Sequence, residues 1–255
     1  MIRRIIIMAG MILFACSCDP GRGVPVFLWH SVGEGSPADK YDVTVEEFDR
    51  ELSAIESYGA VTITLDQLFD ARYGKGVLPK RAVILTFDDG RASQYKAAMP
   101  ILLKHGMVAE TFIVAGKVGE DEAHRHIEHD EDGSHPYLIW PELAEMVRSG
   151  AFRVQSHSMT HPKYSDQIRE RIPFEVVESR RLISERLGVP VNFYAYPFGK
   201  FDGWYKDEVE KAGYLGGMSV QSGMGTRYAM LRVSMYPYVE EVLVDTLNRN
   251  FGPRK

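Results

Sequence analysis

A short buried strand that ends in two acids constrains this chain most. Residues 82–87 are almost wholly apolar, and they run directly into Asp88, Asp89 and Gly90, after which a polar segment is predicted to be a helix. Ligands of parallel α/β proteins bind at the carboxyl ends of strands, so we expect both acids in a functional site. Adjacent carboxylates repel each other unless a cation or a shared proton separates their roles. The pattern suggests that one binds a metal and the other acts as a base.

Strands and helices alternate along the rest of the chain. The predicted strands cover residues 24–30, 61–65, 108–114, 152–156, 214–220 and 230–233, and the predicted helices cover 45–58, 66–69, a segment ending near 105, 140–149, 173–187 and 240–247. Repeated strand–helix units imply a parallel sheet. For a chain of 255 residues we expect an α/β fold with one domain and barrel-like closure.

The amino-terminal residues are typical of an export signal. Basic residues at positions 3 and 4 precede an apolar stretch, 5–15, that is too short to span a membrane comfortably. Residues 13–16, Leu-Phe-Ala-Cys, resemble a bacterial lipobox, in which the cysteine is lipidated. Cys16 and Cys18 are the only cysteines, so the folded part forms no internal disulfide.

These features predict the domain organisation and the location of the protein. We expect a signal peptide of lipoprotein type at residues 1–18, a linker at 19–23 and one domain at 24–255, exported to the cell envelope and attached to the membrane by a lipid. A cleaved signal peptide without lipid and an uncleaved anchor are the alternatives. The net charge of −5 and the absence of a basic cluster beyond the leader argue against nucleic acid as a partner.

A second informative stretch carries two histidines. The strand 152–156 runs into His157, and His161 follows four residues later, so a helical turn would place both imidazoles on one side. Two histidines and a carboxylate from elsewhere form a three-ligand site with positions open for water, as hydrolytic metals need. The histidine pair alone is a weak signal. Together with Asp88 and Asp89 it predicts a metal centre.

Other histidines are less specific. His30 ends the strand 24–30 and is able to face the same site as Asp88, although a histidine at a strand end is as often structural. Residues 119–136 contain four histidines among acids. Their irregular spacing and the lack of an anchoring strand favour a solvated, mobile loop at the rim of the site over a second metal site.

Two motifs resemble a known family. Residues 86–90, Thr-Phe-Asp-Asp-Gly, and 157–162, His-Ser-Met-Thr-His-Pro, are similar to the first two motifs of the polysaccharide deacetylase family, the NodB-homology domain of carbohydrate esterase family four. Their order, spacing and flanking strands agree from about residue 25 to residue 233. The resemblance implies a distorted (β/α) barrel and a hydrolase that removes acetyl groups from a polysaccharide.

The resemblance also assigns roles. Asp89, His157 and His161 would hold a divalent metal, usually zinc, with cobalt, nickel and manganese as alternatives. Asp88 would be the general base that activates the attacking water.

A third stretch, residues 193–199, resembles the third family motif. In that motif an aromatic residue after a proline offers its backbone N–H to the oxyanion of the reaction, and Phe198 takes this position. Tyr196 and Trp204 would supply apolar walls for a sugar ring, although aromatic residues near a strand end are equally often core.

Two positions depart from the family pattern. Ala195 stands where many members carry an arginine that orients the base, and no histidine follows His161, whereas many members carry a late histidine that protonates the leaving amine. The third motif, with Leu-Trp-His at 28–30, resembles the subgroup that deacetylates poly-N-acetylglucosamine exopolysaccharide. We take His30 as the candidate for the missing acid or for a substrate contact, and Arg232 for the missing guanidinium.

Three functions follow from this sequence. The leading one is metal-dependent removal of N-acetyl groups from an amino-sugar polymer, whether poly-N-acetylglucosamine, chitin or peptidoglycan. The second is an O-acetyl esterase, because an ester leaving group needs less help from an acid. The third is a catalytically silent carbohydrate-binding relative. The complete set of acids and histidines favours an enzyme.

Overall fold

The computed structural model describes residues 23–33, 41–130, 133–220, 226–235 and 239–253. The expected signal peptide, with Cys16 and Cys18, and most of the expected linker lie outside these residues. Within the described part of the chain, no helix has the length and apolar character that crossing a membrane requires.

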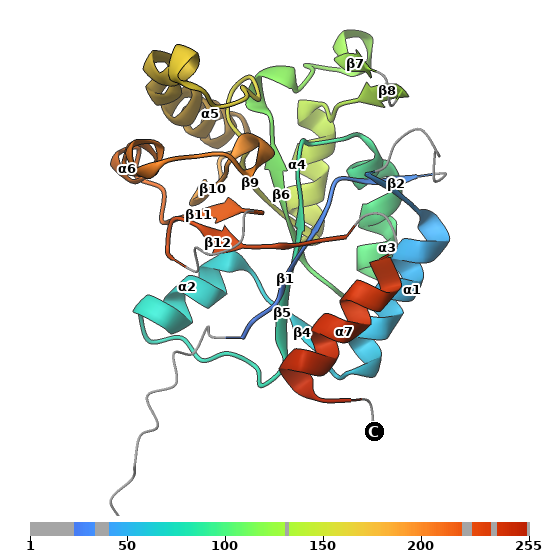
Figure 1. Ribbon diagram of the computed structural model, residues 1–255. Helices are drawn as coiled ribbons and strands as arrows, with labels where there is room; N and C mark the ends of the chain where they lie inside the picture. The colour runs from blue at the N-terminus through green and yellow to red at the C-terminus, as the bar shows by residue number, and fades with distance from the viewer. Residues whose placement is uncertain (1–22, 34–40, 131–132, 221–225, 236–238, 254–255) are drawn as a thin grey trace, which may run out of the picture.

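One parallel sheet of nine strands forms the centre of the molecule (Figure 1). Its strands are β1 (Val26–Trp29), β4 (Val61–Thr62), β5 (Ala82–Phe87), β6 (Ala109–Ile113), β9 (Phe152–Ser156), β10 (Phe193–Ala195), β11 (Gly216–Ser219), β12 (Met230–Leu231) and β13 (Val233–Ser234). Their order is β12-β11-β10-β9-β6-β5-β1-β13, and β4 pairs with β5. The order matches the expected succession of parallel units.

A single extended segment joins the two ends of this sheet. β12 pairs with β11 and β13 pairs with β1, and only Arg232 separates the two strands. The Arg232 N–H donates to the Ser219 carbonyl at 3.0 Å, and the Met235 N–H donates to the Leu28 carbonyl at 2.8 Å. The sheet is therefore nearly closed into a barrel, which confirms the expected fold class, and Arg232 occupies the junction.

Helices surround the barrel. They are α1 (Val45–Ser57), α2 (Leu65–Tyr73), α3 (Met99–Lys104), α4 (Trp140–Ser149), α5 (Ile172–Leu187), α6 (Gly203–Lys211) and α7 (Val239–Phe251), and the π-helical turn η1 (Gln94–Ala98) precedes α3. Short 3₁₀ turns are η2 (Ala115–Lys117), η3 (Glu122–His124), η4 (Asp166–Arg171) and η5 (Pro197–Gly199). In Figure 1, α1, α3 and α7 cover one side and α5 and α6 the other.

Local sequence signals explain where several helices begin and end. Thr44 and Glu47 form a capping box at the start of α1. Gly150 and Gly188 follow α4 and α5 in the left-handed conformation, at φ 79° and 64°, where glycine carries no steric penalty. The predicted strand 61–65 is shorter than expected, because Thr64 caps α2 through a second capping box.

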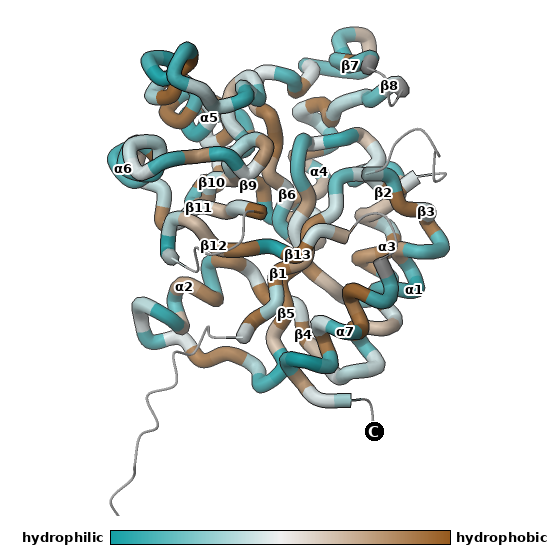
Figure 2. The backbone as a smooth tube through the Cα atoms, in the orientation of Figure 1, coloured by the Kyte–Doolittle hydropathy of each residue, from teal (hydrophilic) through white to brown (hydrophobic). Residues whose placement is uncertain are grey.

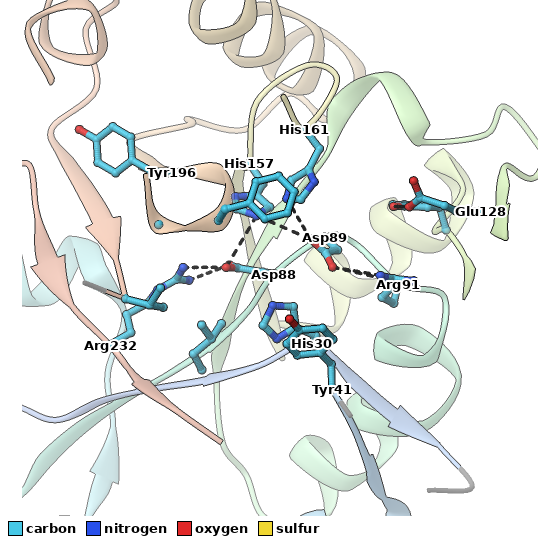
Figure 3. Close-up of a pocket in the computed structure, with 15 residues that line it drawn as sticks. His30, Tyr41, Asp88, Asp89, Arg91, Glu128, His157, His161, Tyr196 and Arg232 are labelled. Carbon is cyan, nitrogen blue, oxygen red and sulfur yellow. Dashed lines mark hydrogen bonds and ion pairs between the residues drawn. The ribbon is translucent and has the colours of Figure 1, made fainter. Parts of the chain in front are cut away.

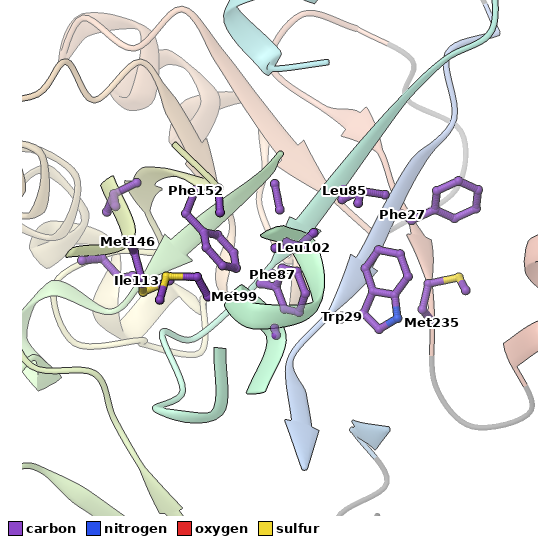
Figure 4. Packing of buried hydrophobic residues seen from close by; sticks show 14 of the residues in the cluster. Phe27, Trp29, Leu85, Phe87, Met99, Leu102, Ile113, Met146, Phe152 and Met235 are labelled. Atoms are coloured by element: carbon purple, nitrogen blue, oxygen red, sulfur yellow. The ribbon is translucent and has the colours of Figure 1, made fainter. Parts of the chain in front are cut away.

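The two faces of the strands pack into two apolar clusters. Leu85 and Phe87 of β5 join the larger cluster beneath the helices, where Trp29 stacks on Phe87 at 5.7 Å between ring centroids (Figure 4). Ile84 belongs to the second cluster, formed by the opposite faces of the strands and by α2. Figure 2 shows the hydrophobic central strands and the hydrophilic outer turns of α5 and α6. Because side chains alternate along a strand, Asp88 continues the Ile84 side.

The polar region 119–136 differs from its prediction as an unanchored loop. It contains the antiparallel hairpin of β7 (Ile127–Asp130) and β8 (Gly133–Pro136). Hydrogen bonds also attach its flank to the turn after β5, from the Leu138 N–H to the Gly90 carbonyl at 2.9 Å. The prediction failed because the hairpin has no alternation of apolar residues. A second small sheet pairs β2 (Ser31–Gly33) with β3 (Asp42–Thr44).

Candidate metal-dependent active site

A cavity of about 430 Å³ lies at the carboxyl ends of the barrel strands. Its lining includes eight of the nine predicted site residues, and Figure 3 shows Asp88, Asp89, His157 and His161 close together at its centre. The eight are His30, Asp88, Asp89, His157, His161, Tyr196, Phe198 and Arg232. The ninth, Trp204, lies on α6 and does not line the cavity; the Arg169 guanidinium covers its indole at 4.5 Å.

The turn after β5 separates the two adjacent carboxylates. Asp89 has a left-handed backbone, with φ at 70°, an uncommon conformation that costs about 1 kcal/mol in a non-glycine residue. Gly90 follows with φ at 78°, and a Cβ there would lie 3.0 Å from Ile113 Cγ2. This turn directs Asp88 toward Arg232 and Asp89 toward the two histidines (Figure 3). The two adjacent carboxylates therefore face different partners.

The two histidines come together on a loop, and the predicted helical turn does not form. Ser158 and His161 both have positive φ, at 74° and 60°. The Ser158 hydroxyl accepts a hydrogen bond from the His161 N–H at 2.9 Å, and the Ser156 hydroxyl accepts one from the Ser158 N–H at 3.2 Å. Serine hydroxyls thus replace the helical hydrogen bonds. The imidazole centroids of His157 and His161 are 4.8 Å apart.

Glu175, which was not predicted from the sequence, holds this loop through hydrogen bonds from α5. It is fully buried in the first turn of α5. Its carboxylate accepts hydrogen bonds from the Met159 N–H at 3.1 Å, the Thr160 N–H at 2.8 Å and the Thr160 hydroxyl at 2.7 Å. Three donors from two consecutive residues therefore fix the loop between the histidines. An acid in the first turn of a helix commonly compensates the helix dipole, so the position of Glu175 did not by itself indicate this role.

Asp89, His157 and His161 form a set that can hold a metal ion. Their ligand atoms lie within 4.8 Å of one another, and both histidine Nε2 atoms are 3.6 Å from Asp89 Oδ1. His157 Nδ1 is 2.8 Å from the Ala195 carbonyl, which can only accept, so Nδ1 carries a hydrogen and Nε2 is the nitrogen that faces the metal-binding set. Burial and His157 lower the pKa of His161 to about 4, so this imidazole is neutral at physiological pH. Two imidazoles and a carboxylate suit zinc and related divalent ions.

Asp88 forms a buried ion pair with Arg232. Both guanidinium contacts, Nη1 to Oδ1 and Nη2 to Oδ2, measure 2.6 Å, and both side chains are buried. Burial opposes ionisation of Asp88, but the charges of Arg232 and His157 hold its pKa below the ordinary value. The closing segment of the barrel thus brings a guanidinium to an acid 144 residues earlier in the chain.

His30 lines the same cavity from the end of β1. Its ring lies 4.8 Å from that of Tyr41, and burial lowers its pKa. Gln94 links it to the acidic turn, because the Gln94 amide donates to the carbonyls of His30 at 3.0 Å and Asp88 at 2.7 Å. The Thr111 hydroxyl donates to Oε1 of the Gln94 side chain at 2.6 Å. Gln94 is buried in a π-helical turn, and nothing in its sequence context indicated this contact.

The third motif contributes two aromatic residues of different kinds. Tyr196 lines the cavity but its ring is buried, stacked on Phe201 at 4.4 Å, and its hydroxyl donates to the Tyr228 carbonyl at 3.0 Å. Phe198 has φ at 57° and is 52% exposed, and its ring centroid is 4.6 Å from that of His161. Phe198 is therefore the more accessible of the two to a ligand.

This protein has a nearly closed (β/α) barrel with a His-His-Asp set beside a separate ionised carboxylate. That arrangement is typical of metal-dependent hydrolases. The sequence model of the family described as polysaccharide deacetylase matches residues 75–217. The chain belongs to the polysaccharide deacetylase family, whose members are metal-dependent enzymes.

Curated relatives and solved structures agree with this assignment. A poly-beta-1,6-N-acetyl-D-glucosamine N-deacetylase of Staphylococcus aureus is 25% identical over 189 residues, covering 71% of this chain and 62% of that protein. One of Escherichia coli is 22% identical over 235 residues, covering 80% of this chain and 35% of that protein. The chain thus spans less than two thirds of either relative.

Two solved structures share the fold. The Streptococcus pyogenes deacetylase PplD in complex with acetate has a TM-score of 0.74 at 22% identity, covering 88% of this chain and 97% of that one. IcaB from Ammonifex degensii has a TM-score of 0.73 at 24% identity, with the same coverage.

Proposed function

We propose that this protein removes N-acetyl groups from an amino-sugar polysaccharide of the poly-N-acetylglucosamine type, with Asp88 as general base. The observation that carries the proposal is the position of the ionised Asp88. Arg232 holds it through two hydrogen bonds, and Asp88 Oδ2 lies 3.8 Å from Nε2 of His157 in the candidate metal set. The names of two relatives support the polymer class. Chitin and peptidoglycan are the other acetylated polymers of this class.

The metal-binding set defines the centre of the proposed reaction. A divalent cation, for which we propose zinc with cobalt, nickel or manganese as alternatives, would be held by Asp89, His157 and His161 and would polarise the acetyl carbonyl and lower the pKa of the attacking water. Asp88 takes the proton from that water. Arg232 keeps Asp88 ionised and oriented, in place of the arginine that Ala195 lacks.

Three other residues complete the proposed site. The backbone N–H of Phe198 donates to the oxyanion that forms on the acetyl carbon. His30 passes the proton that Asp88 has taken from the water on to the leaving nitrogen, and burial, which lowers the pKa of His30, favours that release. Tyr196 contributes an apolar wall, and Trp204 is left out of the site because it lies away from the cavity.

The second candidate is an O-acetyl esterase. No histidine follows His161, and an ester needs less acid assistance at its leaving group than an amide does. Both reactions use the same base and the same metal set, so only the substrate distinguishes them.

Acetate release after metal removal and re-addition tests the proposal. The protein, stripped with a chelator and re-supplied with zinc or cobalt, is offered a β-1,6-linked N-acetylglucosamine pentamer and, in parallel, an O-acetylated sugar. We expect metal-dependent release from the pentamer that is lost in Asp88→Asn and kept in Asp49→Asn, a matched change on the outside of α1. Release from the ester alone would move the protein to the second candidate. Binding without release from either would favour a silent relative.

We also propose that the protein is exported and attached to the cell envelope through Cys16. Palmitate labelling and membrane fractionation of wild type, Cys16→Ala and Cys18→Ala test this. Equal labelling of wild type and Cys16→Ala would exclude the proposed anchor.

A further inference from the structure

A polar cluster on one wall of the cavity has no part in the proposed chemistry. It consists of Lys117 from η2, Glu128 from the hairpin and Tyr137 after the hairpin, and we call it the hairpin cluster. Lys117 Nζ lies 2.7 Å from Glu128 Oε1 and 3.0 Å from the Tyr137 hydroxyl, and that hydroxyl donates to Glu128 Oε2. Glu128 and Tyr137 line the cavity, and Figure 3 shows Glu128 on the side of Arg91.

The hairpin cluster is held in place. Tyr137 is buried, with the Arg91 guanidinium 5.5 Å and the Lys117 ammonium 4.9 Å from its ring centroid. The buried guanidinium of Arg125 donates to the Tyr137 carbonyl at 2.6 Å and to the Glu142 carboxylate at 2.9 and 2.8 Å. Arg91 in turn contacts Asp89 at 3.3 Å. The cluster is thus a rigid extension of the site.

The cluster keeps hydrogen-bonding capacity toward the cavity. Each Glu128 oxygen accepts one hydrogen bond within the cluster and has two lone pairs, so two acceptor positions remain. Lys117 uses two of its three donors. The side chain of Glu128 is 37% exposed and that of Lys117 is 18% exposed, so a ligand can reach both. The complementary ligand presents two adjacent donors and one acceptor.

The charge of the cluster selects between two such ligands. Lys117 compensates Glu128 and Arg91 compensates Asp89, so no uncompensated negative charge faces this wall, and a divalent metal would add positive charge. A second cation, such as the ammonium of a sugar already deacetylated, is therefore disfavoured. Neutral vicinal hydroxyls fit the free acceptor positions, and an acetyl or ring oxygen fits the free donor.

We propose that the hairpin cluster is a binding subsite for the hydroxyl groups of an uncharged, N-acetylated sugar next to the reacting one. This inference rests on the proposed function for the identity of the polymer. It implies that a unit that has lost its acetyl group makes its neighbour a poorer substrate.

Sugar binding in a catalytically silenced protein tests the subsite apart from the chemistry. Calorimetry with the β-1,6-linked N-acetylglucosamine pentamer compares Asp88→Asn alone with the same protein also carrying Glu128→Gln or Glu185→Gln. Glu185 is an exposed acid on α5, paired with Arg181, and is the matched control. We expect Glu128→Gln to weaken binding about tenfold, the effect of losing one hydrogen bond to a charged group, and Glu185→Gln to have no effect.

Lys117→Met supplies a test with the opposite sign. It leaves the Glu128 charge uncompensated, so binding of the acetylated pentamer should fall while binding of the fully deacetylated pentamer should rise. Unchanged binding in Glu128→Gln, or no measurable binding by Asp88→Asn, would overturn the subsite. Tighter binding of the deacetylated than of the acetylated pentamer by Asp88→Asn would overturn the choice of a neutral sugar. A wild-type protein that binds the pentamer through Glu128 but releases no acetate would refute only the proposed function.

Discussion

The pKa values of buried carboxylates shift in opposite directions in two regions of the barrel. At the carboxyl ends of the strands, Asp88 and Asp89 lie beside arginine and histidine side chains, and these charges outweigh burial and lower the pKa of both acids. Away from the site, Glu110 on β6 receives only neutral donors, the Leu65 N–H at 2.8 Å and the Gln155 amide at 3.0 Å. Burial there prevails and raises the pKa of Glu110 to about 7.

Glu51 extends the contrast. It accepts a hydrogen bond from the Trp29 indole at 2.8 Å, and burial raises its pKa to about 8. A buried acid therefore stays ionised in this protein where a cation faces it, and takes up a proton near neutral pH where only one or two neutral donors do. The site differs from the core because positively charged side chains lie beside its acids. These charges keep the acids ionised, as both a base and a metal ligand must be.

The largest expected effect separates the two acids of the site. Asp88→Asn removes the proposed base but none of the metal set, so turnover should fall about 10²- to 10⁴-fold with bound metal unchanged. Asp89→Asn should lose both turnover and metal. Metal content by elemental analysis, measured beside acetate release, distinguishes them. Equal metal loss in both variants would contradict the division of roles.

Removing the Arg232 guanidinium should raise the pKa of Asp88, as burial does for Glu110 and Glu51. Arg232→Met leaves a buried carboxylate unpaired, which costs about 3–5 kcal/mol of unfolding free energy unless Asp88 takes up a proton. The acid limb of the pH–rate profile should therefore move to higher pH. Chemical unfolding and pH profiles measure the two effects, and the double variant with Asp88→Asn should recover most of the stability. An unmoved acid limb would show that Arg232 does not set the ionisation of Asp88.

Glu110 should make the stability of the protein depend on pH in the reverse sense. Its folded pKa of about 7 lies above its ordinary value of 4.5, so its contribution to stability is complete below pH 4.5 and is lost as the pH rises through 7. The shift corresponds to about 3 kcal/mol. Unfolding free energies from pH 4.5 to 7.5 should fall more steeply in wild type than in Glu110→Gln. Any offset from altered hydrogen bonds in the variant does not depend on pH, so parallel curves would exclude a raised pKa.

The features that the sequence predicted are those with a local pattern, and the features that it did not predict depend on tertiary contacts. The strand before Asp88, the histidine pair and the alternation of elements are local patterns, and they predicted the barrel and the candidate metal set. Arg232 was found only because the family motif lacks its arginine. The hairpin, Gln94 and Glu175 were missed because polar residues acquire these contacts only through tertiary proximity, which carries no periodic signal.

Glu175 is a buried carboxylate with a third kind of surroundings, because several donors contact it at once. It receives three neutral hydrogen bonds from Met159 and Thr160, with Arg171 Nη2 at 3.4 Å, and all three fix the loop that carries His161. Glu175→Ala should weaken metal binding about 10- to 100-fold, the usual effect of losing a residue that supports a metal ligand, while Glu175→Gln should recover part of it. Competition with a chromophoric chelator measures this affinity without an activity assay. If a folded Glu175→Ala protein kept the metal affinity of the wild type, the serine hydroxyls alone would hold the loop. The hydrogen bonds to Glu175 would then only compensate the burial of its carboxylate.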